Sequence, residues 1–348
     1  MNTQPWLSIH IFYASHQNPL LLDCIEPLID SLRREALIQR FFFIRYWQEG
    51  SHIRLRLLPS EGVDRDAIKE HIEPTIRSYL KRRPALYNSD HKWLATNSKK
   101  LFQLEYGEEQ WRTTYGNASE IPLRPNNSFA YIPYEPEYTR YGGAAGVALA
   151  EWHFEQSSII VLKMLRTLNV HDRSILLGTS IQLSLLFCYG LLQEDGKVIT
   201  FLENYIRYWQ DDFLQQKHEN EIFEKKYRKM ATHIQQRMLA LRQSIMRGAT
   251  SPLLLTPLEQ EWIAHVRELR HRITGLVEAR QLTLQLHGGS GEPEEVNDLN
   301  MACSILLGSY LHMTNNRLGV SIADEVYLNY LLKRALLDLK PDLKEVVA

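Results

Sequence analysis

The sequence predicts an α+β protein in which a mixed N-terminal β-sheet with packed helices precedes a mostly helical C-terminal half. Two patterns carry this prediction. The first 84 residues alternate between strand-type and helix-type spacing in the order β-α-β-β-α, and nearly every segment after Gly142 and Gly143 has a helical period. We expect one domain over residues 1–348, with a sheet-containing part at 1–141 and a mostly helical part at 142–348.

The expected elements follow from local spacing. WLSIHIFYA (6–14) alternates as a strand does, 18–40 has helical spacing, 41–60 is expected to form a hairpin, and 64–84 a second helix. Between 85 and 140 we expect loops with short strands in LFQLEYG and SFAYIPYEPEYTRY. The long helical stretch 198–248 indicates no function by itself, and leader-peptide binding is the alternative that it leaves open.

Composition argues against a general nucleic-acid binder. The 348 residues contain 40 Lys and Arg against 41 Asp and Glu, so no global positive field attracts DNA. Basic character is local instead, because residues 31–58 hold six arginines and two acids.

The cysteines and the N-terminus favour a reducing compartment. Cys24, Cys188 and Cys303 stand singly in apolar surroundings and are expected to be buried thiols. The start MNTQPWLSIHIFYA has no basic region or cleavage site, and we expect no apolar run to reach membrane-spanning length. These features predict a cytosolic protein.

The stretch FFFIRYWQEGSHIRLRLLPS (41–60) predicts a β-hairpin. With Glu49 and Gly50 as a two-residue loop, Arg45 lies opposite Arg54. One face then carries Arg45, His52, Arg54 and Arg56. The other is a core face of Phe42, Ile44, Tyr46, Ile53, Leu55 and Leu57.

Opposed arginines on one face call for compensation. Like charges directly across a strand pair cost up to about 1 kcal/mol, so an anion is expected on this face. The alternative is that Arg45 and Arg54 pair with carboxylates elsewhere and extend to water. The hairpin alone leaves both interpretations open.

A second candidate lies in YEPEYTRYGG (134–143). Glu135 and Glu137 share one side of an extended segment, Arg140 follows, and two glycines open a long helix where close backbone approach and an anion are both favoured. The competing interpretation is a structural corner in which the glutamates neutralise hairpin arginines.

The third candidate is GSYLHMTNNRLG (308–319). On a helix His312 and Asn316 are one turn apart, whereas Arg317 points about 100° away. A lone histidine on an apolar helix is more often a core residue than a catalytic one. Here Asn316 is placed to orient the ring, as a working base requires.

Several common motifs are absent. The sequence contains no phosphate-binding G-x-x-x-x-G-K-[ST], no dinucleotide fingerprint, no H-E-x-x-H and no paired C-x-x-C. We therefore expect no metal and no cofactor.

Taken in order, FFIRYWQEGSHIRLRL, YEPEYTRYGG with EWHFEQSS, and LHMTNNRLG resemble one family. They are similar to the C-terminal elimination domain of lantibiotic dehydratases, which also occurs as stand-alone thiopeptide-type bacteriocin biosynthesis proteins. The resemblance runs from about Trp6 to about Gly319.

The resemblance implies an activity on a ribosomally made precursor peptide. A separate glutamylation protein would use glutamyl-tRNA to esterify Ser or Thr, and this domain would expel glutamate to leave dehydroalanine or dehydrobutyrine. Two alternatives stay open: joining two dehydroalanines into the pyridine ring of a thiopeptide, or non-catalytic peptide binding in which Arg45, Arg54 and Arg56 hold acidic leader residues.

The resemblance also suggests which residues act. The expected catalytic residues are His312, Arg54, Arg56 and Arg140. The expected substrate-binding residues are Arg45, His52, Glu137, Asn316 and Arg317. We expect Arg54 or Arg56, Arg140 and His312 to line one cleft between the sheet and the helical half.

Overall fold

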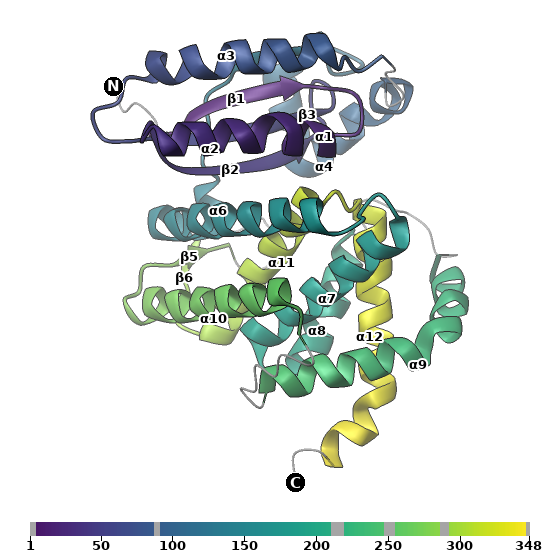
Figure 1. Ribbon diagram of the computed structural model, residues 1–348. Coiled ribbons are helices and arrows are strands. Elements are labelled where there is room, and N and C mark those ends of the chain that lie inside the picture. Colours follow the sequence, from purple (N-terminus) through teal and green to yellow (C-terminus); the bar gives the residue numbers. More distant parts are fainter. Residues whose placement is uncertain (1–4, 87–90, 210–218, 247–254, 286–291, 346–348) are drawn as a thin grey trace. The chain divides into compact units, whose positions relative to one another are not determined.

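The computed structural model describes residues 5–86, 91–209, 219–246, 255–285 and 292–345 (Figure 1). The chain divides into two compact units, residues 1–135 and 136–348. Each is described by itself. The first unit contains a sheet with helices, and the second is mostly helical. This arrangement confirms the α+β prediction.

The first unit contains the predicted β-α-β-β-α order. Its elements are β1 (Leu7–Phe12), α1 (Asn18–Leu20), the π-helical turn η1 (Leu21–Ile25), α2 (Glu26–Arg34), β2 (Ile38–Tyr46), β3 (His52–Pro59), α3 (Arg65–Arg82), α4 (His91–Tyr115) and β4 (Ser128–Tyr131). The strands are ordered β2-β3-β1-β4, and every pairing in this sheet is antiparallel, so the sheet is not mixed. The strand expected at 101–107 is part of α4.

One face of this sheet is apolar. Ile9 and Ile11 on β1 pair with Leu55 and Ile53 on β3, and all four side chains are fully buried. The helices α2 and α3 run alongside the strands (Figure 1), and they supply further buried residues. These are Leu28, Ile29 and Leu32 from α2 and Ile68, Ile72 and Ile76 from α3. Burial of this face is the main driving force for folding the unit.

The hairpin register differs from the prediction. Tyr46 pairs with His52, so the connection is longer than two residues, and Arg45 lies opposite Ile53 while Ile44 lies opposite Arg54. Shifting a register by one residue moves a whole strand's side chains to the other face. The predicted basic face containing Arg45 is therefore wrong.

The turn geometry explains the longer connection. Glu49 and Gly50 both have positive φ, at 62° and 117°, and the N–H of Gly50 donates to the carbonyl of Trp47 at 3.0 Å. The carbonyl of Glu49 also accepts from the N–H of Arg124 at 2.8 Å. The loop thus satisfies its polar groups outside the strand ladder, which short-range turn rules do not anticipate.

The second unit is helical apart from one two-stranded ribbon among the residues described. Its elements are α5 (Tyr138–Tyr141), α6 (Gly143–Thr167), α7 (Arg173–Leu192), α8 (Asp195–Trp209), α9 (Glu219–Met246), α10 (Pro257–Glu278), β5 (Thr283–Leu284), β6 (Glu294–Glu295), α11 (Leu299–Leu318) and α12 (Ile322–Glu345). The predicted stretch 198–248 corresponds to α8 and α9, while 210–218 and 247–248 lie outside the described residues.

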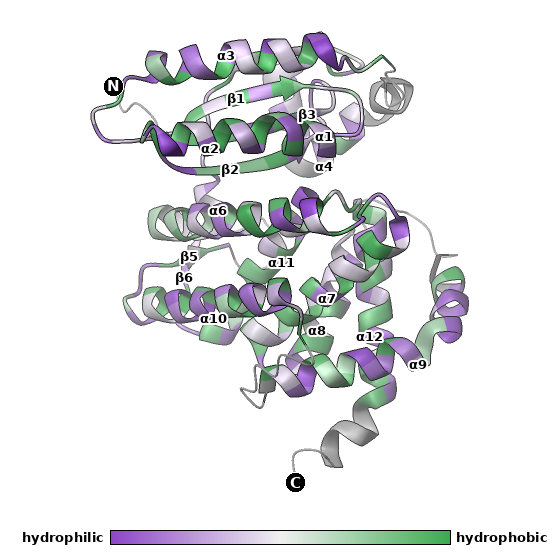
Figure 2. Cartoon of the chain, viewed as in Figure 1, coloured by the Kyte–Doolittle hydropathy of each residue, from purple (hydrophilic) through white to green (hydrophobic). Residues whose placement is uncertain are grey.

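Hydropathy follows the packing of this unit. Helices α3 of the first unit and α9 of the second carry both hydrophilic and hydrophobic residues (Figure 2), as expected for helices with one apolar face. Helix α7 is long and apolar enough to cross a membrane by length and composition, contrary to our expectation for the sequence. However, 61% of its apolar window is buried, and it packs on α10 and α11, as a core helix does.

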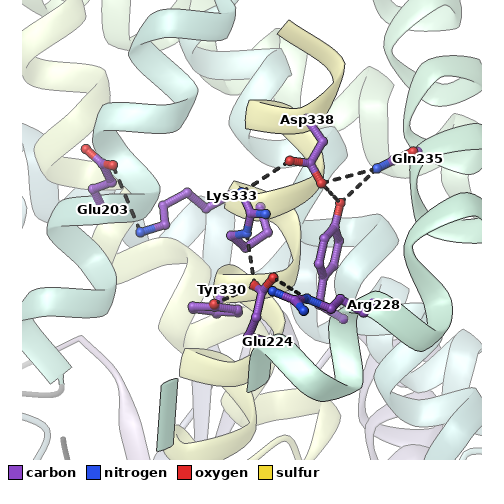
Figure 3. A network of polar contacts seen from close by, with 9 residues as sticks. Glu203, Glu224, Arg228, Gln235, Tyr330, Lys333 and Asp338 are labelled. Atoms are coloured by element: carbon purple, nitrogen blue, oxygen red, sulfur yellow. Dashed lines mark hydrogen bonds and ion pairs between the residues drawn. The ribbon is translucent and has the colours of Figure 1, made fainter. Parts of the chain in front are cut away.

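A polar network joins α9 to α12 (Figure 3). Glu224 accepts hydrogen bonds from Arg228 at 3.0 Å, Tyr330 at 2.9 Å and Arg334 at 3.1 Å. Tyr227 donates to Asp338 at 2.6 Å. The network attaches the polar side of α9 to the helix that follows α11.

All three cysteines are free and buried, as predicted. Burial raises the pKa of the Cys24 thiol to about 12 and that of the Cys303 thiol to about 11. Neither thiol is therefore a ready nucleophile near neutral pH.

Candidate functional site

A tight turn between α11 and α12 brings distant side chains together. Gly319 adopts a left-handed φ of 92° and its N–H donates to the carbonyl of Asn315 at 3.0 Å, which ends α11. Ser321 then accepts from the N–H of Asp324 at 3.2 Å and opens α12. The chain reverses, and α12 packs beside α11.

This reversal places Glu325 against His312. The Nδ1 atom of His312 lies 3.1 Å from Oε1 of Glu325, and the two side chains are 17% and 0% exposed. The hydroxyl of Tyr205, on α8, donates to the other oxygen of the same carboxylate. Burial and the neighbouring Glu325 raise the pKa of Tyr205 well above its usual range, so the phenol stays protonated.

The imidazole is also held by ring packing. Trp209, four residues after Tyr205 on α8, has its ring centroid 5.0 Å from that of His312. Residues four apart on a helix share a face. Helix α8 therefore supplies both the phenol that holds the carboxylate and the indole that packs on the histidine.

Arg140 lies in the same unit as His312 and contacts α11, the helix that carries His312. Its Nε donates to the hydroxyl of Ser309 at 3.1 Å, and its Nη1 lies 3.1 Å from a carboxylate oxygen of Glu137. Ser309 and His312 are three residues apart on α11 and share a side of it. The charge of Arg140 also acts on the pKa of Tyr205, where it opposes the raising effect of burial.

The two glycines after Arg140 let side chains near β5 approach the backbone closely. Gly142 has a φ of 94°, and a Cβ there would lie 2.9 Å from Cδ2 of Leu282. Gly143 has a φ of 79°, and its Cβ would lie 3.0 Å from the hydroxyl oxygen of Thr283. Both positions meet the β5 region, as the close-approach interpretation of this glycine pair expects.

The hairpin arginines lie in the first unit on a polar sheet face. Here Nδ1 of His52 donates to the carbonyl of Gly50 at 2.7 Å, and Nε2 accepts from Nε of Arg54 at 3.3 Å. Burial and the nearby positive charge of Arg54 lower the pKa of His52 to about 3. His52 is 1% exposed and serves as a neutral support for Arg54.

Arg54 and Arg56 differ in their surroundings. The guanidinium of Arg54 stacks 3.4 Å from the ring centroid of Tyr46. Arg56 is 4% exposed, and its Nε and Nη1 have no hydrogen-bond partner among the residues that the structure describes. Burial, reinforced by Arg54, lowers the pKa of Arg56 to about 9. A buried cation with donors to spare suits a carboxylate ligand.

Arg45 and Arg317, which the sequence predicts to bind substrate, make contacts with residues outside the His312 and Arg54 groups. Arg45 donates to Oδ1 of Asn18 at 2.6 Å on the opposite side of the sheet from Arg54. Arg317 is fully buried, donates to the hydroxyl of Ser158 at 3.1 Å and lies 4.6 Å from the ring centroid of Phe154. The substrate-binding role expected for these two arginines stays a prediction.

Sequence reasoning missed Glu325, Tyr205 and Trp209. It proposed Asn316, partly buried one turn after His312, to orient the ring. The signal that was available is the helix stop LGVS directly after the histidine helix, followed by the acidic pair in SIADEVY. A short connection of this kind predicts adjacent antiparallel helices, which would have placed one of these acids near His312.

The family described as lantibiotic biosynthesis dehydratase C-term matches residues 6–336. The chain belongs to this family. The match confirms the resemblance seen in the three sequence segments, and it makes the protein a member of a family of peptide-antibiotic biosynthesis enzymes. No curated protein sequence matched significantly.

Solved structures similar to this family member share its fold at low identity. A protein described as the pyridine synthase TbtD from thiomuracin biosynthesis has a TM-score of 0.69 at 18% identity, covering 97% of this chain and 99% of its own. TsrL has a TM-score of 0.65 at 17% identity, with 96% and 94% covered.

The tRNA-dependent lantibiotic dehydratase MibB from Microbispora sp. 107891 is also similar in fold. It has a TM-score of 0.54 at 17% identity, and the match covers 98% of this chain but 29% of MibB. The fold of this family member thus occurs both as a chain of similar length and as part of a much longer one.

The predicted site is only partly assembled within one unit. Arg140 contacts Ser309 and His312 contacts Glu325 within residues 136–348, whereas Arg54 and Arg56 belong to residues 1–135. That all four line one cleft stays a prediction.

Proposed function

We propose that this protein eliminates glutamate from glutamylated Ser or Thr residues of a ribosomally made precursor peptide, leaving dehydroalanine or dehydrobutyrine. The observation that carries the proposal is a partly exposed His312 held by a buried carboxylate, on a helix whose Ser309 binds Arg140. Elimination needs a positioned base and a nearby cation, and this cluster contains both.

The reaction assigns a task to each group. His312 takes the Cα proton of the glutamylated residue, and the electron pair released forms the Cα=Cβ double bond. The Cβ–O bond breaks, and glutamate leaves with that electron pair on its carboxylate. A base at His312 acts through Nε2, because Nδ1 faces Glu325.

Arginine supplies the charge that this reaction requires. The guanidinium of Arg140 stabilises negative charge as it develops on the substrate carbonyl or the leaving carboxylate. Arg54 and Arg56 are the candidates for recognising the glutamyl group, with the unpaired donors of Arg56 as the supporting feature.

The proposal requires two partners. One is the precursor peptide, and the other is a separate protein that attaches glutamate from glutamyl-tRNA. The similarity to 29% of MibB, a dehydratase described as tRNA-dependent, supports a division of labour in which the remaining length performs the other step.

Pyridine-ring formation is the second candidate. It is favoured by the similarity to TbtD, described as a pyridine synthase, over nearly the whole of both chains. A cyclase acts on dehydroalanines that are already formed, so it needs shape and polarisation of the peptide more than recognition of glutamate.

One experiment separates the candidates. The purified protein is incubated in parallel with glutamylated and with already dehydrated precursor peptide, and both are followed by mass spectrometry. Loss of glutamate from the first supports elimination. Ring formation with loss of the leader peptide from the second supports the cyclase, and no change in either supports a non-catalytic peptide-binding role.

A further inference from the structure

Glu325 has two neighbours that each offer it one hydrogen. The carboxylate is 1% exposed. One oxygen accepts from the hydroxyl of Tyr205 and the other lies 3.1 Å from Nδ1 of His312. Tyr205 lies on α8, His312 on α11 and Glu325 on α12, so the contacts depend on how these three helices pack.

This arrangement restricts the form of the imidazole. An ionised carboxylate is only an acceptor, so Nδ1 of a neutral His312 must carry the hydrogen and Nε2 must be bare. Tyr205 cannot become a hydrogen-bond acceptor toward Glu325, because its raised pKa keeps the phenol protonated. The opposite tautomer would place the Nδ1 lone pair against those of a carboxylate whose side chain is 0% exposed.

We propose that Glu325 and Tyr205 are positioning residues that hold His312 in the Nδ1–H tautomer and so present Nε2 as the base. The part of this claim that concerns catalysis rests on the proposed elimination. The part that concerns the tautomer does not, because it follows from the contacts of the protein alone.

Helix α8 holds both the carboxylate of Glu325 and the imidazole of His312 in place. Tyr205 reaches the carboxylate from one turn of α8, and Trp209 on the next turn packs on the imidazole with a centroid distance of 5.0 Å. Hydrogen bonding sets the tautomer, and ring packing limits rotation of the side chain about its χ angles.

The test reads the tautomer directly. Ring nitrogen NMR shifts of ¹⁵N-histidine-labelled full-length protein, assigned with His312→Gln, report which nitrogen carries the hydrogen. We expect Nδ1–H in the wild type. In Glu325→Gln the amide can also donate, and we expect the Nε2–H form to become populated. An Nε2–H wild type would overturn the proposal without any variant.

Activity variants provide the second readout. Glu325→Gln should lower kcat on glutamylated peptide substantially, up to about 10⁴-fold, the loss known for a carboxylate-to-amide change that alters a histidine tautomer. KM should change little, since the carboxylate is buried behind His312 and its side chain is 0% exposed. Glu325→Asp should recover part of kcat, and Tyr205→Phe should lose roughly 10-fold for one hydrogen bond.

The matched control is Glu203→Gln on α8, which removes a half-exposed carboxylate 4.0 Å from Lys333. It should change neither the tautomer nor kcat. If Glu325→Gln keeps the wild-type tautomer and kcat, the positioning role is wrong. A wild type with the Nδ1–H tautomer but no elimination activity would count against the proposed function alone.

Discussion

Nε of Arg140 donates to the hydroxyl of Ser309 across 3.1 Å, one helical turn before His312. Arg140 precedes α6 and Ser309 lies within α11, so the contact joins segments that are 169 residues apart. The same guanidinium lies 3.1 Å from Glu137. These two contacts hold the charge of Arg140 next to α11, the helix that carries His312.

Arg140→Ala should therefore impair the reaction more than binding. We expect kcat for elimination to fall by roughly 10²–10³-fold, the usual loss when one donor to a developing negative charge is removed. Arg140→Lys should recover part of it, because it keeps the charge and loses the planar fork. Arg280→Ala removes an exposed arginine 3.8 Å from Glu295 and should leave steady-state kinetics unchanged. A similar loss in both alanine variants would contradict a specific role for Arg140.

Gly142→Ala should destabilise the second unit. A side chain at this φ of 94° is strained, and its Cβ would lie 2.9 Å from Leu282, so we expect a loss of about 1–3 kcal/mol in unfolding free energy. Gly178→Ala is the control, because that helical position has no atom within 4 Å of the added Cβ. It should be neutral or stabilising by up to about 1 kcal/mol. Urea denaturation measures both, and equal effects would refute the close-approach argument.

Acid should destabilise the first unit through His52. Its pKa falls from 6.5 to about 3 on folding, mainly because the ring is buried. Between these values the unfolded chain binds the proton and the folded chain does not, so stability is greatest above pH 6.5 and falls as the pH drops toward 3. The loss is at most about 1.4 kcal/mol per pH unit from this one group.

Urea midpoints at pH 7 and pH 5 test this linkage. His52→Gln should show a smaller difference between the two pH values than the wild type. His71→Gln removes a histidine whose side chain is 42% exposed and should keep the wild-type difference. A wild-type difference that survives in His52→Gln would assign the acid sensitivity to other groups.

Glu224 should anchor α9 in a pH-dependent way. Its hydrogen bond from Arg228, with further bonds from Arg334 and Tyr330, lowers its pKa from 4.5 to about 2. The stabilising effect is present above pH 4.5 and is lost as the pH falls toward 2. Glu224→Gln should therefore cost about 1 kcal/mol at pH 7 and show less acid destabilisation, with faster amide hydrogen exchange in α9. Glu221→Gln, exposed on the same helix, should stay within about 0.5 kcal/mol.

Strand and helix periods were enough to predict the fold class, although not the antiparallel pairing of the whole sheet. Ile9 and Ile11 alternate with polar or aromatic residues along β1, and they lie with Leu55 on the buried face of the sheet. This alternation can be seen in the sequence. The register of the hairpin could not be predicted in this way. The loop length depends on the left-handed φ of Glu49 and on the hydrogen bond that its carbonyl accepts from Arg124. A one-residue error there moved Arg45 to the wrong face.

The site was predictable only where spacing along one helix decides geometry. Helical spacing puts Arg317 about 140° around α11 from His312, and the structure buries it against Phe154, although from the sequence we expected it to bind substrate. The contacts from Glu325 and Tyr205 come from other helices. They depend on how α8, α11 and α12 pack, which no local period encodes.

The central claim is that His312 is the base for glutamate elimination. The most direct measurement is the mass of glutamylated precursor peptide after incubation with the wild type and with His312→Ala, alongside peptide binding by both. The wild type should convert the peptide to its dehydrated form. His312→Ala should bind it nearly as well but eliminate glutamate roughly 10²–10⁴-fold more slowly. Wild-type protein that leaves the glutamylated peptide unchanged, or a variant as fast as the wild type, would contradict the account.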